Sequence, residues 1–365
     1  MAQLLDRIEK QLSVEVEPTG RAVLIARKAI YLSRTGRFAE ARSFTAELRG
    51  HFGIGQSARV TAWIMLLEGV CFLYENINPA AFDRVHRAQF LSLAIRDREL
   101  ISITSAWKAH LEFENSNFAG MAEALKMAID NVTEDDDDAD ARLSMVLADA
   151  LFLCGDRKLA QSWFMRSRRH AIDAGDQATI EALLYNRAAF STAWLRCERC
   201  FTRDEPSDIT LIRLEVSSAR NFQVMTNITA FGHLISLCDA RLLILESEFE
   251  RAITALELVR NRGPFASYNF DQDIIDLEIA YCQLMLGRND QAFKTFNQIR
   301  GNDLSGLDLD DRLVVAWTRS VMSGADARFG DTAVETGRLE MLRSEYSVFR
   351  NGLQELLSQF TITCP

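Results

Sequence analysis

The amino-acid sequence predicts an all-α fold: a solenoid of about seven antiparallel helix pairs with a C-terminal helical cap. Three observations support this fold class. One residue pattern recurs with a period close to 40 residues, apolar residues upstream of each turn recur at helical spacing, and no window alternates apolar and polar residues convincingly as a strand would. The 365 residues include only 5 prolines and 18 glycines, which argues against a turn-rich β fold, and 48% hydrophobic residues suffice for a large core.

The recurring pattern is a small residue, an apolar residue three positions on, a turn residue seven on, an alanine twelve on and usually a bulky residue sixteen on. The leading small residues are Ala29, Gly69, Ala109, Ala148, Ala188, Ala240 and Ala280, with weaker copies at Ala109 and Ala188. Small residues let two helices approach closely, and Gly36, Gly155 and Gly287 can adopt the left-handed conformation that ends a helix. Each copy therefore predicts a helix–turn–helix unit that must stack on its neighbours to bury its apolar face.

Two segments, Tyr31–Ala41 (YLSRTGRFAEA) and Leu284–Ala292 (LMLGRNDQA), resemble the turn regions of tetratricopeptide repeats. The resemblance covers roughly residues 20–300. The period is about 40 residues, whereas that family's is about 34, and no repeat closes with the family's proline. The longer period is similar to the tetratricopeptide-like domains of bacterial signalling regulators and peptide sensors. The resemblance implies a right-handed superhelix whose first helices line a concave binding surface.

The remaining parts of the chain are predicted as caps and connections. An amphipathic helix through Leu5, Ile8 and Leu12 is expected at the N-terminus, and the segment Phe201–Asp208 (FTRDEPSD) reads as a loop that holds an insertion of about twelve residues. The expected domains are an N-terminal capping helix (1–19), a first lobe of repeats (20–200), a second lobe after the loop insertion (201–300) and a C-terminal helical cap (301–365).

Seven large side chains in the last segment recur at steps of three and four residues, which is the spacing of a heptad seam. They are Leu339, Leu342, Tyr346, Phe349, Leu353, Leu356 and Phe360. This helix either folds back to cap the last repeat or pairs with a second copy in a homodimer. Gly352 and the aromatic residues in the seam favour the cap, because a regular two-stranded coil accommodates them poorly.

Composition restricts the location and the partners. The net charge is −10 at pH 7 and no basic tail occurs, which argues against direct binding of nucleic acid or of an anionic membrane. No apolar run is long enough to cross a membrane, no signal-peptide core is found, and seven scattered cysteines do not suggest a disulfide framework. We therefore expect a cytoplasmic protein with reduced thiols, and the predominance of arginine over lysine hints at a bacterial source.

Three short motifs invite a chemical interpretation, and each has a simpler structural one. Cys197 and Cys200 form a single CxxC, whereas a zinc site usually needs two further ligands at suitable spacing. The segment Gly53–Ala58 matches a dinucleotide fingerprint but follows a predicted helix instead of a strand. The acidic run Glu134–Asp138 lacks the ligand spacing of a calcium loop and suits a helix N-terminus. We expect no cofactor, no metal and no catalytic residue.

Positions that match the family's inward-facing ones are the candidate partner-binding residues. They are Trp63, Tyr74, Arg142, Asn186, Arg241 and Tyr281. The surrounding positions are largely apolar, which suits an amphipathic helix or a hydrophobic peptide segment, although the same residues could simply pack repeat on repeat. The leading hypothesis is a non-enzymatic scaffold that binds a protein or peptide. The alternatives are a signal-peptide receptor that changes superhelix pitch and acts through a partner protein, and an enzyme with a site in a cleft.

Overall fold

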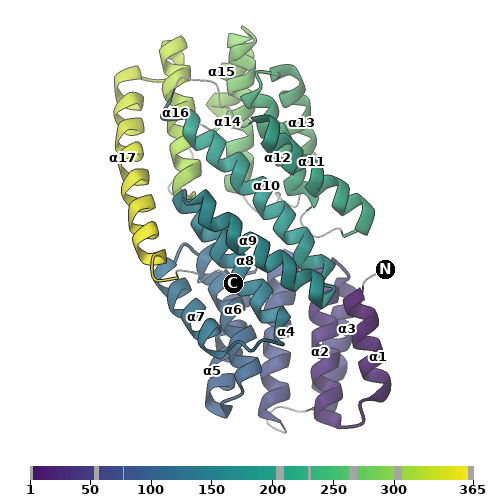
Figure 1. Ribbon diagram of the computed structural model, residues 1–365. Coiled ribbons are helices and arrows are strands. Elements are labelled where there is room, and N and C mark those ends of the chain that lie inside the picture. The colour runs from purple at the N-terminus through teal and green to yellow at the C-terminus, as the bar shows by residue number, and fades with distance from the viewer. Residues whose placement is uncertain are drawn as a thin grey trace. The chain divides into compact units, whose positions relative to one another are not determined.

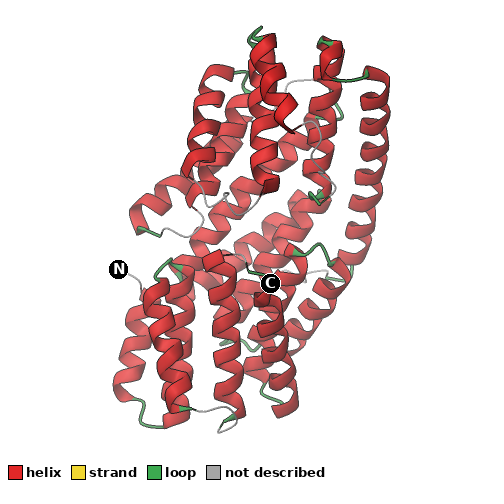
Figure 2. Cartoon of the chain, turned by 180° about the vertical axis from the view of Figure 1, so that it is seen from behind, coloured by secondary structure: helices red, strands yellow, loops and turns green. Residues whose placement is uncertain are grey.

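The computed structural model describes residues 3–52, 57–76, 78–202, 209–228, 232–262, 269–299 and 306–360, and in these ranges the chain forms helices and no strand (Figures 1 and 2). The α-helices are α1 (Gln3–Val14), α2 (Pro18–Arg34), α3 (Phe38–His51), α4 (Ala58–Asn76), α5 (Ala80–Ile95), α6 (Arg98–Glu114), α7 (Phe118–Asn131), α8 (Asp137–Cys154), α9 (Arg157–Ala174), α10 (Gln177–Arg199), α11 (Ile209–Thr226), α12 (Gly232–Leu245), α13 (Phe249–Arg262), α14 (Asn269–Met285), α15 (Asn289–Ile299), α16 (Leu309–Ala325) and α17 (Thr332–Leu357). A short 3-10 helix, η2 (Ala327–Phe329), precedes α17. The predicted all-α fold class is confirmed.

The turns between paired helices lie where the repeat pattern predicts them. Gly36, Gly155 and Gly287 have φ values of 84°, 93° and 75°, in the left-handed region that glycine tolerates without a steric cost. Ser116 and Ser247 occupy the same position in their repeats, with φ values of 56° and 62°. These five turns share a left-handed backbone conformation at the same position of the repeat, which confirms the predicted spacing of these turns.

Short polar side chains start several of the helices. Asp97, Asn117, Asp136 and Asp156 each accept a hydrogen bond from the backbone N–H three residues on, at 3.1–3.3 Å. Such N-caps satisfy backbone donors that have no partner inside the helix. The acidic run therefore lies where the simpler interpretation places it, in the turn before α8 and in its first turn.

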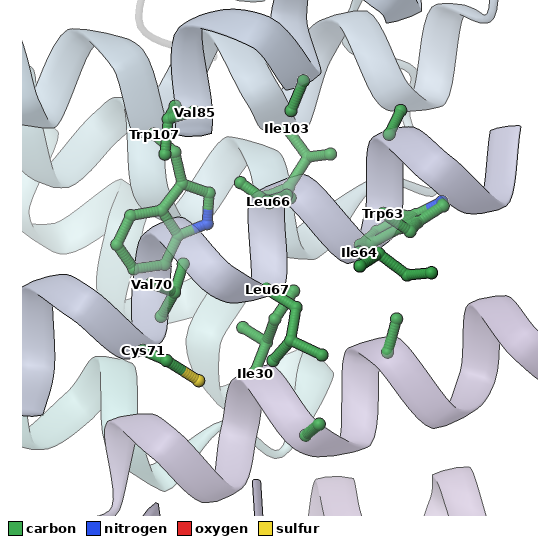
Figure 3. Packing of buried hydrophobic residues seen from close by; sticks show 14 of the residues in the cluster. Ile30, Trp63, Ile64, Leu66, Leu67, Val70, Cys71, Val85, Ile103 and Trp107 are labelled. Carbon is green, nitrogen blue, oxygen red and sulfur yellow. The ribbon is translucent and has the colours of Figure 1, made fainter. Parts of the chain in front are cut away.

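Helices pack in consecutive pairs, and the first helices of neighbouring pairs also pack on each other, as α2, α4, α6 and α8 do. The leading small residue of the repeat lets the two helices of one pair approach closely. A Cβ atom on Gly69 would lie 2.6 Å from Cγ2 of Val85, the bulky residue that closes the same repeat. The aromatic and aliphatic residues of α2, α4, α5 and α6 fill the remaining space, including Leu67 and Trp107 (Figure 3).

The chain divides into two compact units. Unit 1 comprises residues 1–183 with 223–230 and 353–365, and unit 2 comprises 184–222 and 231–352. The division falls inside α10, while the sequence placed the lobe boundary at 200; the expected domain ranges stay a prediction. In unit 1, α1 lies against the turn between α9 and α10, where the Leu4 N–H donates to the Gly175 carbonyl at 3.1 Å.

The predicted seam residues lie on α17 and just beyond it. Leu339, Leu342, Tyr346, Leu353 and Phe360 are buried, and Phe349 and Leu356 are half-buried. In unit 2, the residues from 339 to 349 pack against the end of α10 and one side of α16. Arg343 also holds α17 against the end of α10, because its Nε donates to the Cys200 carbonyl at 2.7 Å. This packing inside the chain favours the capping alternative, and the oligomeric state stays a prediction.

Candidate functional site

The candidate partner-binding residues are divided between the two units. Trp63, Tyr74 and Arg142 belong to unit 1, whereas Asn186, Arg241 and Tyr281 belong to unit 2. Trp63, Arg142 and Tyr281 are only 2–3% exposed. Trp63 packs among the apolar residues of α4 and its neighbours (Figure 3). In this conformation these three side chains are therefore interior residues, and a role in binding a partner stays a prediction.

Two of the six, Tyr74 and Arg142, belong to a group of polar and aromatic side chains inside unit 1 that we call the interior cluster. Its members come from the first helices of successive pairs and from the residue that precedes α10. They are Arg34, Tyr74, Trp107, His110, Arg142, Asp176, Thr179 and Glu181.

Arg34 and Asp176 form the best-paired part of the interior cluster. Arg34 Nη1 donates to Asp176 Oδ2 at 2.7 Å across 142 residues of sequence, and the two side chains are 3% and 2% exposed. Thr179 donates to the same carboxylate through its backbone N–H at 3.0 Å and its hydroxyl at 2.8 Å. Burial raises the pKa of the Asp176 carboxyl, but attraction to Arg34 and these hydrogen bonds outweigh it, and the net shift is downward.

Arg142 lacks such a carboxylate. Its guanidinium lies 3.8 Å from the centre of the Trp107 ring, a cation–π contact. Across the described residues, no acidic side chain pairs with Arg142, and its Nη1 is buried without a hydrogen-bond partner. Burial lowers its pKa, and the charge of Arg34 adds to this; Tyr74, Asp176 and Asp138 act in the opposite direction, and the net shift is downward. The interior cluster thus contains a cation whose charge the chain does not neutralise directly.

His110 and Glu181 also have buried polar atoms without partners in the described chain. His110 meets the Trp107 ring edge to face at 5.9 Å, and its Nδ1 has no hydrogen-bond partner. Burial, followed by the charges of Arg142 and Arg34, lowers the pKa of His110 to about 3, so the imidazole is neutral at pH 7. Burial raises the pKa of Glu181 to about 7, opposed by Arg34, and Oε1 of this carboxyl lacks a partner.

Sequence reasoning found only Tyr74 and Arg142 of this group. Trp107 and His110 flank Ala109, the small residue of one of the weaker copies, and none of the six candidate residues comes from that copy. A signal was nevertheless present, because two aromatic-type side chains three residues apart share one face of a helix. Arg34 and Asp176 had no local signal, since their pairing depends on which distant turns meet.

In unit 2 the buried arginine of the comparable interior group is paired with carboxylates. Arg196 donates to Glu278 Oε1 at 2.7 Å and to Asp311 Oδ1 at 3.0 Å, and Arg241 Nε donates to Glu278 Oε1 at 3.1 Å. Tyr281 accepts from Arg199 Nη2 at 3.2 Å. Arg196 and Arg241 thus face two acids, while Arg199 lies 5.0 Å from the centre of the Trp317 ring, and the network ties α10, α12, α14 and α16 together.

The remaining motifs have structural roles or lie outside the described residues. Cys197 and Cys200 are buried beside Leu313 and Tyr346, and burial raises the pKa of both thiols, that of Cys200 to about 12.

Within the described ranges, no three acidic, histidine or cysteine side chains gather as a metal site requires. Residues 53–56 of the glycine-containing segment lie outside the part that the structure describes. None of the described helices has the length and apolar character needed to cross a bilayer.

Comparisons with known proteins agree with this architecture. No protein-family model matches the sequence, and no curated protein matches it. The structure is similar to a crystal structure of a Rap protein complexed with Competence and Sporulation Factor, with a TM-score of 0.58 and 12% identity. The similarity covers 94% of this chain and 99% of that chain. At this identity the likeness establishes the fold, which is a tetratricopeptide-like helical repeat.

Proposed function

We propose that this protein is a non-enzymatic peptide-binding scaffold whose ligand contacts the interior cluster of unit 1. The observation that carries the proposal is that three polar groups, on Arg142, His110 and Glu181, are buried without hydrogen-bond partners in the described chain. Native interiors rarely leave such groups unpaired, because each costs free energy of about 1–3 kcal/mol. A ligand that supplies partners recovers this free energy on binding.

An extended peptide suits the arrangement of these groups. They lie on α6, α8 and α10, the first helices of three successive pairs. A peptide backbone offers a donor and an acceptor at every residue, and an extended peptide advances about 3.3 Å per residue, so it can reach several helices in turn. The Rap protein of similar fold is complexed with Competence and Sporulation Factor, which supports a binding role for the same architecture.

Burial of the cluster is the observation that supports the second candidate function, a signal-peptide receptor. Arg142 is 2% exposed and Glu181 is 6% exposed, so a ligand reaches them only when the first helices of unit 1 separate. Binding would then select a conformation in which these helices are spaced differently. This is the behaviour of a signal-peptide receptor that acts through a partner protein, in a bacterial cytoplasm. Co-purification distinguishes the scaffold from the receptor. A stoichiometric protein partner indicates a scaffold, and a short bound peptide indicates a receptor.

The substitution His110→Phe tests the proposed site. It removes the unpartnered Nδ1 and keeps an aromatic ring against Trp107. We expect the ligand-free variant to melt at or above the wild-type temperature, because a buried unpaired polar atom is lost. Retention of peptides from a random hexapeptide library, measured by mass spectrometry after gel filtration, should fall at least fivefold.

His86→Phe is the matched control, because His86 is exposed on α5 and stacks on Phe82. This variant should retain peptides as the wild type does. If the wild type retains no peptide, the proposed function is wrong. If His110→Phe melts several degrees lower and retains peptides normally, His110 is a structural residue and the site lies elsewhere.

A further inference from the structure

Arg142 is the unusual residue of the interior cluster because its charge is both buried and unpaired. The other buried arginines of the described ranges each have a carboxylate within 3.0 Å: Arg34 has Asp176, and Arg196 has Glu278 and Asp311. Among the described residues, Arg142 contacts the face of Trp107, and the attraction of Tyr74, Asp176 and Asp138 reaches it without a carboxylate within 4.0 Å. A ring face attracts a guanidinium, but it replaces neither the hydrogen bonds nor the charge of a carboxylate.

The acids near Arg142 are committed to other groups. Asp176 accepts from Arg34 and twice from Thr179. Asp138 lies 3.9 Å from Arg27, and its side chain is 30% exposed. Neither carboxylate comes within 4.0 Å of the Arg142 guanidinium in the described structure. The chain therefore supplies charges around Arg142 but no hydrogen-bonding anion to it.

We propose that Arg142 receives a carboxylate group of the bound ligand, with Trp107 as the stacking platform and His110 Nδ1–H as a second donor. This rests on the proposed function and specifies the chemistry that the site recognises. A guanidinium is planar and presents paired N–H groups that match the two oxygens of a carboxylate. The carboxylate is either the C-terminus of a peptide or an acidic side chain within it.

A carboxylate fits this site better than a phosphate does. One unpaired guanidinium offers a single positive charge, and a carboxylate carries a single negative charge. A phosphate ester near pH 7 carries more than one, and its excess charge would be buried beside Asp176 and Glu181. His110, which is neutral at pH 7, contributes a hydrogen bond without adding a positive charge.

The substitution Arg142→Met tests this inference, since methionine keeps an apolar stem over Trp107 and removes the charge. Wild type and variant are each incubated with a random hexapeptide library bearing free C-termini and with the same library amidated. We expect the variant to retain at least tenfold less peptide from the free-acid library. Arg87→Met is the control, because Arg87 is 59% exposed on α5 and pairs only with Asp83; it should retain peptides as the wild type does.

The two libraries distinguish the sources of the carboxylate. If amidation abolishes retention by the wild type, the group is the C-terminus; if amidated peptides bind and are enriched in aspartate or glutamate, it is a side chain. Equal retention by Arg142→Met and wild type overturns the carboxylate assignment and leaves the peptide-binding proposal standing. Retention by neither protein overturns both.

The melting temperature of the ligand-free variant gives a readout that does not depend on finding a peptide. A buried cation without a partner destabilises the folded state, so Arg142→Met should melt at or above the wild-type temperature. A fall of more than about 5 °C would show that the chain itself compensates the charge, and it would overturn the inference whatever the libraries retain.

Discussion

Glu181 makes the stability of unit 1 depend on pH in the opposite direction to that of most acids. Burial raises its pKa from the ordinary value of 4.5 to about 7, so the folded state holds a proton that the unfolded chain releases. Stability therefore falls as the pH rises from about 4.5 to 7, by about 3 kcal/mol at most. We expect Glu181→Gln to remove this part of the decline, measured by urea unfolding at pH 5, 6, 7 and 8. An unchanged pH profile would show that Glu181 ionises normally in the folded protein.

The contribution of the Arg34–Asp176 pair to stability depends on pH in the direction that is usual for an acid. The pKa of Asp176 is lowered in the fold, so its contribution is present above the unfolded pKa and is lost as the pH falls through the folded value. Removing one partner leaves a buried charge, and we expect Asp176→Asn to cost about 3–5 kcal/mol near pH 7. The double variant Arg34→Met with Asp176→Leu should cost less than the sum of Arg34→Met and Asp176→Leu measured singly. Additive effects would mean that the two side chains do not interact.

At the scale of helices, the close approach of paired helices can be tested at Gly69. A Cβ there meets Val85 at 2.6 Å and the Ala81 carbonyl at 3.2 Å, so Gly69→Ala should lower stability by about 1–3 kcal/mol despite the better helix propensity of alanine. Gly337→Ala is the control, since nothing lies within 4 Å of its Cβ position on α17, and it should raise stability by about 0.5–1 kcal/mol. Thermal melts of both variants measure this, and a stabilising Gly69→Ala would contradict the close approach.

The repeats were predictable because their local chemistry is repeated along the chain. Gly36, Gly155 and Gly287 each mark a backbone conformation that other residues adopt reluctantly, and all three have it. The site was only partly predictable. Tyr74 and Arg142 lie at positions that the repeat phase gives, whereas the Arg34–Asp176 contact joins turns four repeats apart. No period identifies such a contact, because it depends on how far each stacked pair rotates on the last.

For the whole molecule, the role of α17 follows from what it covers. Leu339, Leu342 and Tyr346 bury themselves against α10 and α16 in unit 2, which is worth roughly 1.5–3 kcal/mol for each side chain. We therefore expect a chain that ends at Asp331 to aggregate or to melt early, because Leu313, Cys197 and Cys200 lose their cover. A chain that ends at Phe360 is the control and should behave as the full chain does. Sedimentation of the full chain and of the two truncated chains tests this expectation. A full-length dimer that becomes a well-folded monomer on truncation at Asp331 would show that α17 joins two copies and does not cap one.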